Sequence, residues 1–305
     1  MLYSTNTEFI KDGIDLFEGL DLILGAGFPA LDFSVFWDYD YILGDGYKEK
    51  AGKIRRFVED RGAVVNQIHA PFGGGPEHYG NVTVPTLPRI LEFASLLGAK
   101  CAIVHPIHGE PFHKNREMIF ERNIKFYSSL APYAKDFGIK VALENMWQRR
   151  PVSNYIEDNI FADPRELSLA FDALADSEAF TVCLDIGHVA ICGREPEDAI
   201  DIIGSRLGAL HVHDVDYVHD SHTLPGQGML DWEKICKALA RVNYSGDFTL
   251  EANSFIKNYP KELYPTALKM MNDVAKYYSE KVDEYKSDLR LMRSRCLGRT
   301  KKTSF

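Results

Sequence analysis

The chain has 305 residues, 45% of them hydrophobic and 26% charged, and its formal net charge is −9. These proportions exclude a largely disordered chain or a coiled coil, and they predict a globular protein with a large core. The negative charge predicts no nucleic-acid partner, because attraction to phosphate needs a basic surface.

Short β-branched apolar runs alternate with amphipathic stretches along the chain. Residues 2–6 and 30–34 are predicted as the first two strands, with a helix at residues 16–24 between them. Apolar runs then predict six further strands, at residues 64–70, 101–105, 140–144, 180–185, 207–213 and 247–251. Helical periodicity predicts helices that follow these strands, at residues 87–99, 115–137, 163–175, 196–205, 231–242 and 263–281.

Strands that alternate with helices predict parallel strands joined by crossover helices. Eight such strands fit a closed (β/α)8 TIM barrel, which we predict as a single α/β domain with a C-terminal helical, basic extension. A doubly wound open sheet is the alternative fold. It gains no support from the sequence, because no Gly-x-Gly-x-x-Gly motif follows the first strand.

Charge is distributed unevenly along the chain. Residues 286–305 contain seven basic side chains and one acidic side chain, and the other residues carry a net charge of −15. We therefore predict an acidic barrel at residues 1–281 and a basic extension at residues 282–305. Leu289, Met292 and Cys296 are apolar at helical spacing, which favours packing of this extension on the body or on a neighbouring subunit.

The sequence further predicts a cytoplasmic protein without membrane association. No apolar run approaches the length of a membrane span, and no signal peptide is visible at residues 1–13. The five cysteines are odd in number and lack close Cys-x-x-Cys pairs. They are therefore expected to be reduced thiols and not parts of a disulfide framework or a zinc knuckle.

The apolar runs share one feature, because each is followed by a residue type that binds metals or transfers protons. These residues are His69, His105, Glu144, Asp185, His211 and Glu251. They lie 26 to 41 residues apart, which is about one βα unit each. Since the carboxyl ends of all barrel strands meet on one face, we expect the six side chains to converge there.

A cluster of acidic side chains in a barrel mouth predicts a bound cation. Burial of Glu144, Asp185 and Glu251 would be costly without a compensating charge, and a divalent metal ion would remove that cost. Three carboxylates with one histidine are rich in oxygen ligands, which suits Mn²⁺, Mg²⁺ or Co²⁺, with Zn²⁺ also compatible. We expect one divalent metal, with Mn²⁺ as the first choice. Cys183 is expected to lie one layer deeper, in the core.

The motifs between residues 69 and 251 resemble, as an ordered set, the xylose isomerase-like barrel superfamily. This superfamily contains sugar isomerases and epimerases and the abasic-site nucleases of the endonuclease IV type. The motifs are His69-Ala-Pro, Val104-His105-Pro, Leu143-Glu144-Asn145, Leu184-Asp185-Ile-Gly-His188, Leu210-His211-Val-His-Asp214, Asp220-Ser-His222-Thr-Leu-Pro-Gly-Gln-Gly228 and Leu250-Glu251. The resemblance implies a TIM barrel acting on a small carbohydrate, and dimers or tetramers are common among such enzymes.

The resemblance also implies roles for individual residues. Glu144, Asp185, His211 and Glu251 would hold the metal, and His188 would hold or polarise a substrate oxygen. Glu144 and Glu251 would remove and return a proton next to a carbonyl group, through an enediolate, as in a sugar, sugar phosphate or keto-acid isomerase or epimerase. Further contacts to the substrate are expected from His69, His105, His188, Arg150, Asp220 and His222.

Other positions refine this interpretation. Gly187 is expected to allow a tight turn after Asp185. His213 is expected not to bind the metal, because the pattern of the superfamily places the metal on the first histidine of His-x-His-Asp. Ketose 3-epimerases carry a glutamate where this chain has Arg150 and an arginine where it has Tyr217. These departures argue against a ketohexose 3-epimerase, and Arg150 would instead meet an anionic group.

Two alternative functions stay open. One is an endonuclease IV-like AP endonuclease, and the net charge of −15 outside the tail argues against it. All nine ligand types of its trinuclear zinc site occur in order, at His69, His105, Glu144, Asp185, His188, His211, Asp220, His222 and Glu251. The other alternative is a non-catalytic carbohydrate-binding barrel, against which the intact pair Glu144 and Glu251 argues.

Overall fold

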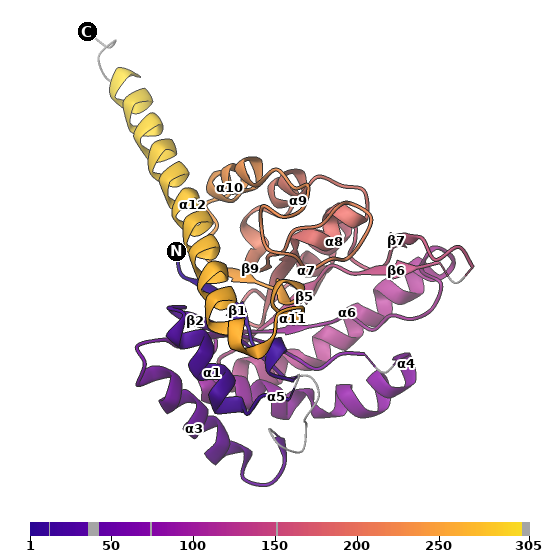
Figure 1. Ribbon diagram of the computed structural model, residues 1–305. Coiled ribbons are helices and arrows are strands. Elements are labelled where there is room, and N and C mark those ends of the chain that lie inside the picture. The colour runs from indigo at the N-terminus through magenta and orange to yellow at the C-terminus, as the bar shows by residue number, and fades with distance from the viewer. Residues whose placement is uncertain (12, 36–42, 74, 151, 301–305) are drawn as a thin grey trace.

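A computed structural model describes residues 1–11, 13–35, 43–73, 75–150 and 152–300 (Figure 1). Its central sheet has eight strands, β1 (Tyr3–Asn6), β2 (Ala30–Ser34), β3 (Val64–His69), β4 (Cys101–Val104), β5 (Lys140–Glu144), β8 (Phe180–Asp185), β9 (Leu207–His211) and β10 (Phe248–Leu250). Neighbouring strands pair in parallel, in the order β10-β1-β2-β3-β4-β5-β8-β9.

The chain beyond β9 closes this sheet into a barrel by pairing with β10. The backbone NH of Val212 donates to Thr249 O at 2.8 Å, and the NH of Glu251 donates to Val212 O at 2.9 Å. The strand order therefore runs once around a ring, without the reversal that a doubly wound sheet shows. The predicted TIM barrel is confirmed, the open sheet is excluded, and the first strand predicted at residues 2–6 is present as β1.

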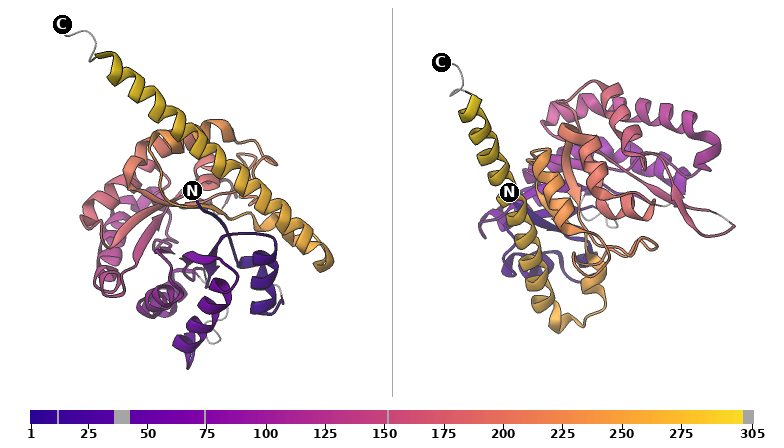
Figure 2. Two further views of the ribbon diagram at one scale, coloured as in Figure 1. Left: turned by 90° about the vertical axis from the view of Figure 1, so that its left-hand side faces the viewer. Right: turned by 90° about the horizontal axis from the view of Figure 1, so that it is seen from above.

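Helices surround the barrel on its outside (Figures 1 and 2). The long ones are α1 (Leu16–Gly25), α3 (Tyr47–Glu59), α5 (Val84–Leu97), α6 (Phe112–Phe137), α7 (Pro164–Leu174), α9 (Pro196–Ile203), α10 (Trp232–Arg241) and α12 (Tyr264–Thr300). The short helices are η1 (Glu8–Lys11), α4 (Gly75–His78), η2 (Tyr79–Thr83), α8 (Ile186–Ile191), η3 (Gly204–Arg206), α11 (Asn253–Lys257) and η4 (Lys261–Leu263), and a hairpin joins β6 (Trp147–Arg149) to β7 (Ile156–Asp158).

Polar residues and glycines set the ends of the long helices. The carboxylates of Asp15, Asp163 and Asp231 accept hydrogen bonds from backbone NH groups in the first turns of α1, α7 and α10, which satisfies donors that have no partner inside the helix. Gly98 and Gly138 end α5 and α6 with φ angles of 88° and 64°, a conformation that glycine adopts without strain.

Hydrophobic side chains fill two separate regions. The larger core lies between the strands and the surrounding helices, and Tyr127, Phe161 and Phe180 are fully buried in it. A small cluster made by β4, β5, β8 and β9 contains Cys101, Ile103, Ala142, Cys183 and Ala209. Cys183 precedes Asp185 by two residues, so it lies one layer below the strand ends, as predicted.

The last helix is longer than the sequence analysis predicted. It was expected to end at Lys281, but α12 continues to Thr300. No proline or glycine occurs between Pro265 and Gly298, and the ion pair of Lys281 with Glu284 at 2.7 Å spans the expected end. The division between residues 281 and 282 falls within this helix and stays a prediction. In the described part of the chain, no helix has the length and apolar character needed to cross a membrane.

Candidate active site

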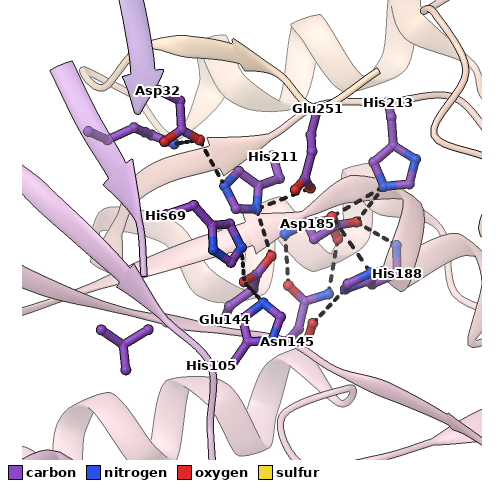
Figure 3. Close-up of polar contacts among 12 residues, drawn as sticks. Asp32, His69, His105, Glu144, Asn145, Asp185, His188, His211, His213 and Glu251 are labelled. Carbon is purple, nitrogen blue, oxygen red and sulfur yellow. Dashed lines mark hydrogen bonds and ion pairs between the residues drawn. The ribbon is translucent and has the colours of Figure 1, made fainter. Parts of the chain in front are cut away.

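A cavity of about 380 Å³ opens at the carboxyl ends of the strands, and Figure 3 shows the polar side chains gathered there. Its lining includes seven of the predicted site residues: His69, His105, Glu144, His188, Asp220, His222 and Glu251. Two more, Asp185 and His211, are completely buried beside it. The structure thus brings together the six residues that end the apolar runs.

Four of these side chains form a group of candidate metal ligands. Glu144, Asp185, His211 and Glu251 come from β5, β8, β9 and the residue after β10, and their ligand atoms lie within 4.8 Å of one another. His211 Nδ1 lies 2.7 Å from Glu144 Oε1 and 3.3 Å from Glu251 Oε2. The three carboxylates are buried, and every ion-pair partner that the structure gives them is a histidine. Such a buried acidic set fits a divalent cation.

Two further histidines lie on the other side of Glu144. His105 Nε2 is 2.9 Å from Glu144 Oε2, and His69 Nε2 is 3.8 Å from the same oxygen. The rings of His69 and His211 are stacked, with their centroids 5.2 Å apart. His69, Glu144 and His211 make a second group whose ligand atoms lie within 4.8 Å of one another, so Glu144 belongs to two groups.

A third group of candidate ligands consists of His188, His213, Asp220 and His222. Asp220 Oδ2 lies 3.3 Å from His222 Nε2 and 3.7 Å from His188 Nε2. His213 Nε2 lies 3.0 Å from Asp185 Oδ1, which links this group to the first. His213 was expected not to bind the metal, and the structure places it against a metal-ligand candidate and within reach of the third group.

Asp214 organises the loop that carries Asp220 and His222. Its carboxylate accepts hydrogen bonds from the backbone NH groups of Val215, Gly226 and Leu230 and from the indole NH of Trp232, at 2.8 to 3.2 Å. These four bonds join both ends of the loop to one buried anion. The backbone at His222 has a φ angle of 43°, which is uncommon for a residue other than glycine, so this fold of the loop holds a locally unfavourable conformation.

Asn145 positions Asp185 and His188 together. Its amide donates to Asp185 O at 3.0 Å and accepts from Asp185 N at 2.8 Å. Its backbone oxygen lies 2.8 Å from His188 Nδ1, and the NH of His188 donates to Asp185 Oδ1 at 2.7 Å. These contacts occupy Nδ1 of His188, so Nε2 is the ring nitrogen that remains for a substrate.

Gly187 serves the site differently from the prediction. It was expected to allow a tight turn, but it lies in α8 and is not among the glycines with a positive φ angle. A Cβ atom at this position would lie 2.0 Å from Cε1 of His213, so the absence of a side chain is what admits the His213 ring.

Replacing Gly187 with alanine should therefore displace His213 from Asp185. We expect the free energy of unfolding to fall by about 1–3 kcal/mol, the usual cost of an overpacked core. Chemical denaturation of both forms measures this difference. Gly52→Ala is the control, because its Cβ would meet only the flexible end of Arg56 at 3.4 Å. Equal stability of the Gly187 variant and the unaltered protein would contradict the account.

Asp32 is a site residue that the sequence analysis missed. It lies in β2, is completely buried, and its Oδ2 lies 3.4 Å from His211 Nε2 and accepts a hydrogen bond from Gln67 at 3.1 Å. A carboxylate behind a ligand histidine fixes the orientation of the ring. The sequence feature that could have identified Asp32 is an acidic residue within the apolar run Ala-Leu-Asp-Phe-Ser at residues 30–34.

The buried environment shifts the pKa values of the two glutamates in opposite directions. Burial raises the pKa of Glu251 to about 8, against the opposing effect of His211 and His222. Burial also opposes ionisation of Glu144, but His211 and His105 outweigh it and hold the pKa of Glu144 well below its usual range. Burial lowers the pKa of His211, but Cys183, Glu251 and Glu144 outweigh this effect and raise the pKa well above its usual range. In the metal-free protein, Glu251 and His211 therefore hold protons at neutral pH.

Arg150 does not line the cavity. It lies on the hairpin that joins β6 and β7, is exposed, and its Nε donates to Glu157 Oε2 at 2.5 Å. Arg149 donates to Asn154 O at 3.0 Å and stacks over the Trp147 ring. The structure therefore pairs both arginines within their own hairpin, away from the predicted contact with the substrate.

Comparisons with known proteins agree with the fold. The family model described as "Xylose isomerase-like TIM barrel" matches residues 20–274. The protein y4fM of Sinorhizobium fredii is 25% identical and the match covers 82% of this chain and 84% of that protein. D-psicose 3-epimerase of Enterocloster bolteae is 23% identical over 76% of this chain and 75% of its own length.

Superposition on solved structures also supports the TIM barrel fold. The crystal structure of a D-tagatose 3-epimerase-like protein superposes with a TM-score of 0.73 at 21% identity, covering 93% of this chain and 99% of that one. A structure of the IOLI protein "with a binding zinc atom" superposes with a TM-score of 0.70 at 16% identity and the same coverage. At these identities the solved structures support the fold, and the family model spans most of the chain. The chain therefore belongs to the xylose isomerase-like TIM barrel family.

Proposed function

We propose that the chain is a divalent-metal-dependent enzyme that isomerises or epimerises a sugar by moving a proton next to a carbonyl group. The observation that carries this proposal is the group of Glu144, Asp185, His211 and Glu251, whose ligand atoms lie within 4.8 Å of one another beside the cavity. The names of the relatives, among them a D-psicose 3-epimerase, support a sugar as the substrate.

The same four residues would hold one cation. Three carboxylates and one imidazole suit Mn²⁺ first, and they also accept Mg²⁺, Co²⁺ or Zn²⁺. A bound cation would supply positive charge where negative charge develops on the carbonyl oxygen. The zinc named for a solved structure of this fold supports a cation site in the barrel.

Glu144 and Glu251 are proposed to move the proton. They reach the cavity from β5 and from the end of β10, so they can approach a substrate from two sides. One of the two would remove the proton and the other would return it. Loss of a proton beside the carbonyl gives an enediolate. Return of the proton to the opposite face gives epimerisation, and return to the adjacent carbon gives isomerisation.

The lining of the cavity favours an uncharged sugar over a phosphosugar or a keto-acid. Among the described residues, those that line the cavity include aromatic rings such as Phe72, Tyr79 and Trp147 but neither lysine nor arginine. A phosphate group is usually bound by such basic side chains. His188 Nε2, with Asp220 and His222 close to it, would instead contact hydroxyl groups of the sugar.

The proposal is tested by product analysis. Protein reconstituted with Mn²⁺ is incubated with a panel of ketoses, keto-acids and phosphosugars, and products are identified by NMR. We expect an epimer or isomer of an uncharged sugar that the metal-free protein does not form. Conversion of phosphosugars alone would overturn the proposed substrate class, and conversion of no compound would overturn the enzyme proposal.

Metal affinity should depend on pH because protons and cations compete for the same group. Glu251, with a pKa of about 8 in the metal-free protein, must lose its proton before it can bind a cation. Below pH 8 the affinity should therefore fall, by about tenfold per pH unit for each proton displaced. Calorimetric titration with Mn²⁺ in two buffers of different ionisation enthalpy measures the released protons. Constant affinity between pH 6 and 8 would contradict the competition.

A second candidate function, the AP endonuclease, rests on the other two groups. His69 and His105 lie beside Glu144, and His188, Asp220 and His222 belong to the third group, so all nine residue types of a three-zinc centre converge. The acidic charge of the chain outside the tail still argues against DNA binding. Metal content measured by mass spectrometry separates the candidates. One ion per chain supports the isomerase, and three zinc ions support the nuclease.

A further inference from the structure

The C-terminal half of α12 extends beyond the barrel. The first half packs on the body through buried side chains, including Leu268, Met271, Ala275 and Val282. After Val282 no described side chain of the helix is buried, and Met292 is 62% exposed. All three views show this half projecting away from the barrel (Figures 1 and 2). An isolated helical arm of this length gains little stability from helix propensity alone. We therefore expect its apolar residues to pack against a partner.

Apolar residues form one continuous stripe along α12. Ala275, Tyr278, Val282, Tyr285, Leu289 and Met292 follow one another at alternating intervals of three and four residues. This spacing is the seam of a coiled coil. The body of the barrel covers the first half of the seam. Tyr285, Leu289 and Met292, which we call the outer stripe, continue the same seam. Tyr285 still packs against the core, Leu289 is half-buried, and Met292 is exposed, so the cover by the body decreases along the stripe.

Charge changes sign along the same helix. Residues 273–288 hold five acidic and three basic side chains, whereas residues 290–300, at the end of the helix, hold four basic side chains and no acidic one. Two such helices side by side in parallel would place basic segments together. An antiparallel pair would place the basic segment of each helix against the acidic segment of the other, which is favourable.

We propose that a second copy of this chain docks on the outer stripe, so that two α12 helices pair antiparallel across a twofold axis. A self-complementary surface is what such symmetry requires, and the reversal of charge along α12 provides it. A surface pocket lies beside the stripe and is lined by Ala240, Arg241, Asn243, Lys286, Leu289 and Arg290. Its three basic side chains suit an acidic side chain of the second copy. The basic segment projects away from its own barrel, so its acidic partner is that of another molecule.

The test is the mass of the full-length protein in solution, measured by light scattering during size-exclusion chromatography. The unaltered protein is expected to be a dimer. Leu289→Glu with Met292→Glu should be a monomer with unchanged helical circular dichroism, because two charges then lie in the seam. Leu291→Glu is the matched control, since Leu291 is 56% exposed and lies off the stripe, and this variant should remain a dimer.

A charge-exchange experiment tests the antiparallel orientation. Glu280→Lys with Glu284→Lys should raise the dissociation constant of the dimer at least about tenfold at low salt, and adding Arg290→Glu with Arg293→Glu should restore it. A monomeric unaltered protein at 100 µM would overturn the proposal. A dimer that survives Leu289→Glu with Met292→Glu would overturn it too, because the interface would then lie elsewhere. Assembly only on added DNA or RNA would show that the basic segment serves a nucleic acid instead.

Discussion

Replacing Glu251 with glutamine is expected to lower kcat by about three orders of magnitude, within the range reported for loss of a general acid or base. Glutamine keeps the shape of the side chain but can neither carry nor release the proton. Glu251 lines the cavity, is 6% exposed, and lies 3.3 Å from His211 Nδ1. Steady-state kinetics with the substrate found by the product screen measure the effect, at saturating Mn²⁺.

Two controls separate the proton transfer from other effects of this substitution. Glu233→Gln removes a charge from the exposed face of α10, where Glu233 pairs with Lys237, and should leave kcat unchanged. Metal content measured on the same samples shows whether the variant still holds its cation. Turnover within tenfold of the unaltered protein, with the metal bound, would show that Glu251 does not transfer the proton.

Replacing Asp185 with asparagine is expected to weaken Mn²⁺ binding at least about a hundredfold, because loss of a direct ligand should cost no less than loss of a residue behind one. Asp185 is completely buried, and its backbone bonds with Asn145 do not involve the carboxylate, so the local fold should persist. At a Mn²⁺ concentration one hundred times the Kd of the unaltered protein, the cation should stabilise that protein by about 2.7 kcal/mol. At the same concentration, the thermal unfolding of the Asp185→Asn variant should not respond to Mn²⁺.

Asp220→Asn is the matched control for Asp185→Asn. Asp220 belongs to the third group of candidate ligands, so a single cation held by the first group predicts that this variant keeps its response to Mn²⁺. Loss of bound metal in both variants would contradict a single site and would favour the multinuclear alternative. An unchanged response in Asp185→Asn would contradict the proposed ligand set.

The strand ends explain why much of the site was predictable from the sequence. A parallel barrel places the carboxyl ends of its strands on one face, so residues separated by a whole βα unit converge without any knowledge of side-chain positions. Glu144, Asp185 and His211 end β5, β8 and β9 in the structure, and Glu251 follows β10 directly. Topology alone therefore brings the metal-ligand group together.

Contacts between elements were not predictable, because they depend on packing. Asp32 reads as one polar residue in an apolar strand, and only the closed barrel places it 3.4 Å from His211. Gly187 reads as a turn residue, and only the position of the His213 ring shows that it provides clearance. Arg150 follows the strand that ends at Glu144, but the hairpin pairs it with Glu157 instead of directing it to the cavity.

Two helices were predicted wrongly, for a different physical reason. Helix α3 was not predicted because charged residues dominate its sequence, although Ala51, Ile54 and Val58 form a buried face at helical spacing. The end of α12 was predicted at Lys281, one residue before the last buried position, Val282, although the chain beyond has neither proline nor glycine up to Gly298. Burial and helix formation are separate properties, and α12 continues after its contact with the barrel has ended.

The measurement that tests the central claim most directly is hydrogen exchange between substrate and solvent. The Mn²⁺-loaded protein is incubated in D₂O with the panel of ketoses, keto-acids and phosphosugars, and abasic DNA is supplied to a parallel sample. Proton transfer through an enediolate predicts deuterium on the carbon next to the carbonyl of a sugar, and none with Glu251→Gln. Cleavage of abasic DNA together with no deuterium in any compound would contradict the account.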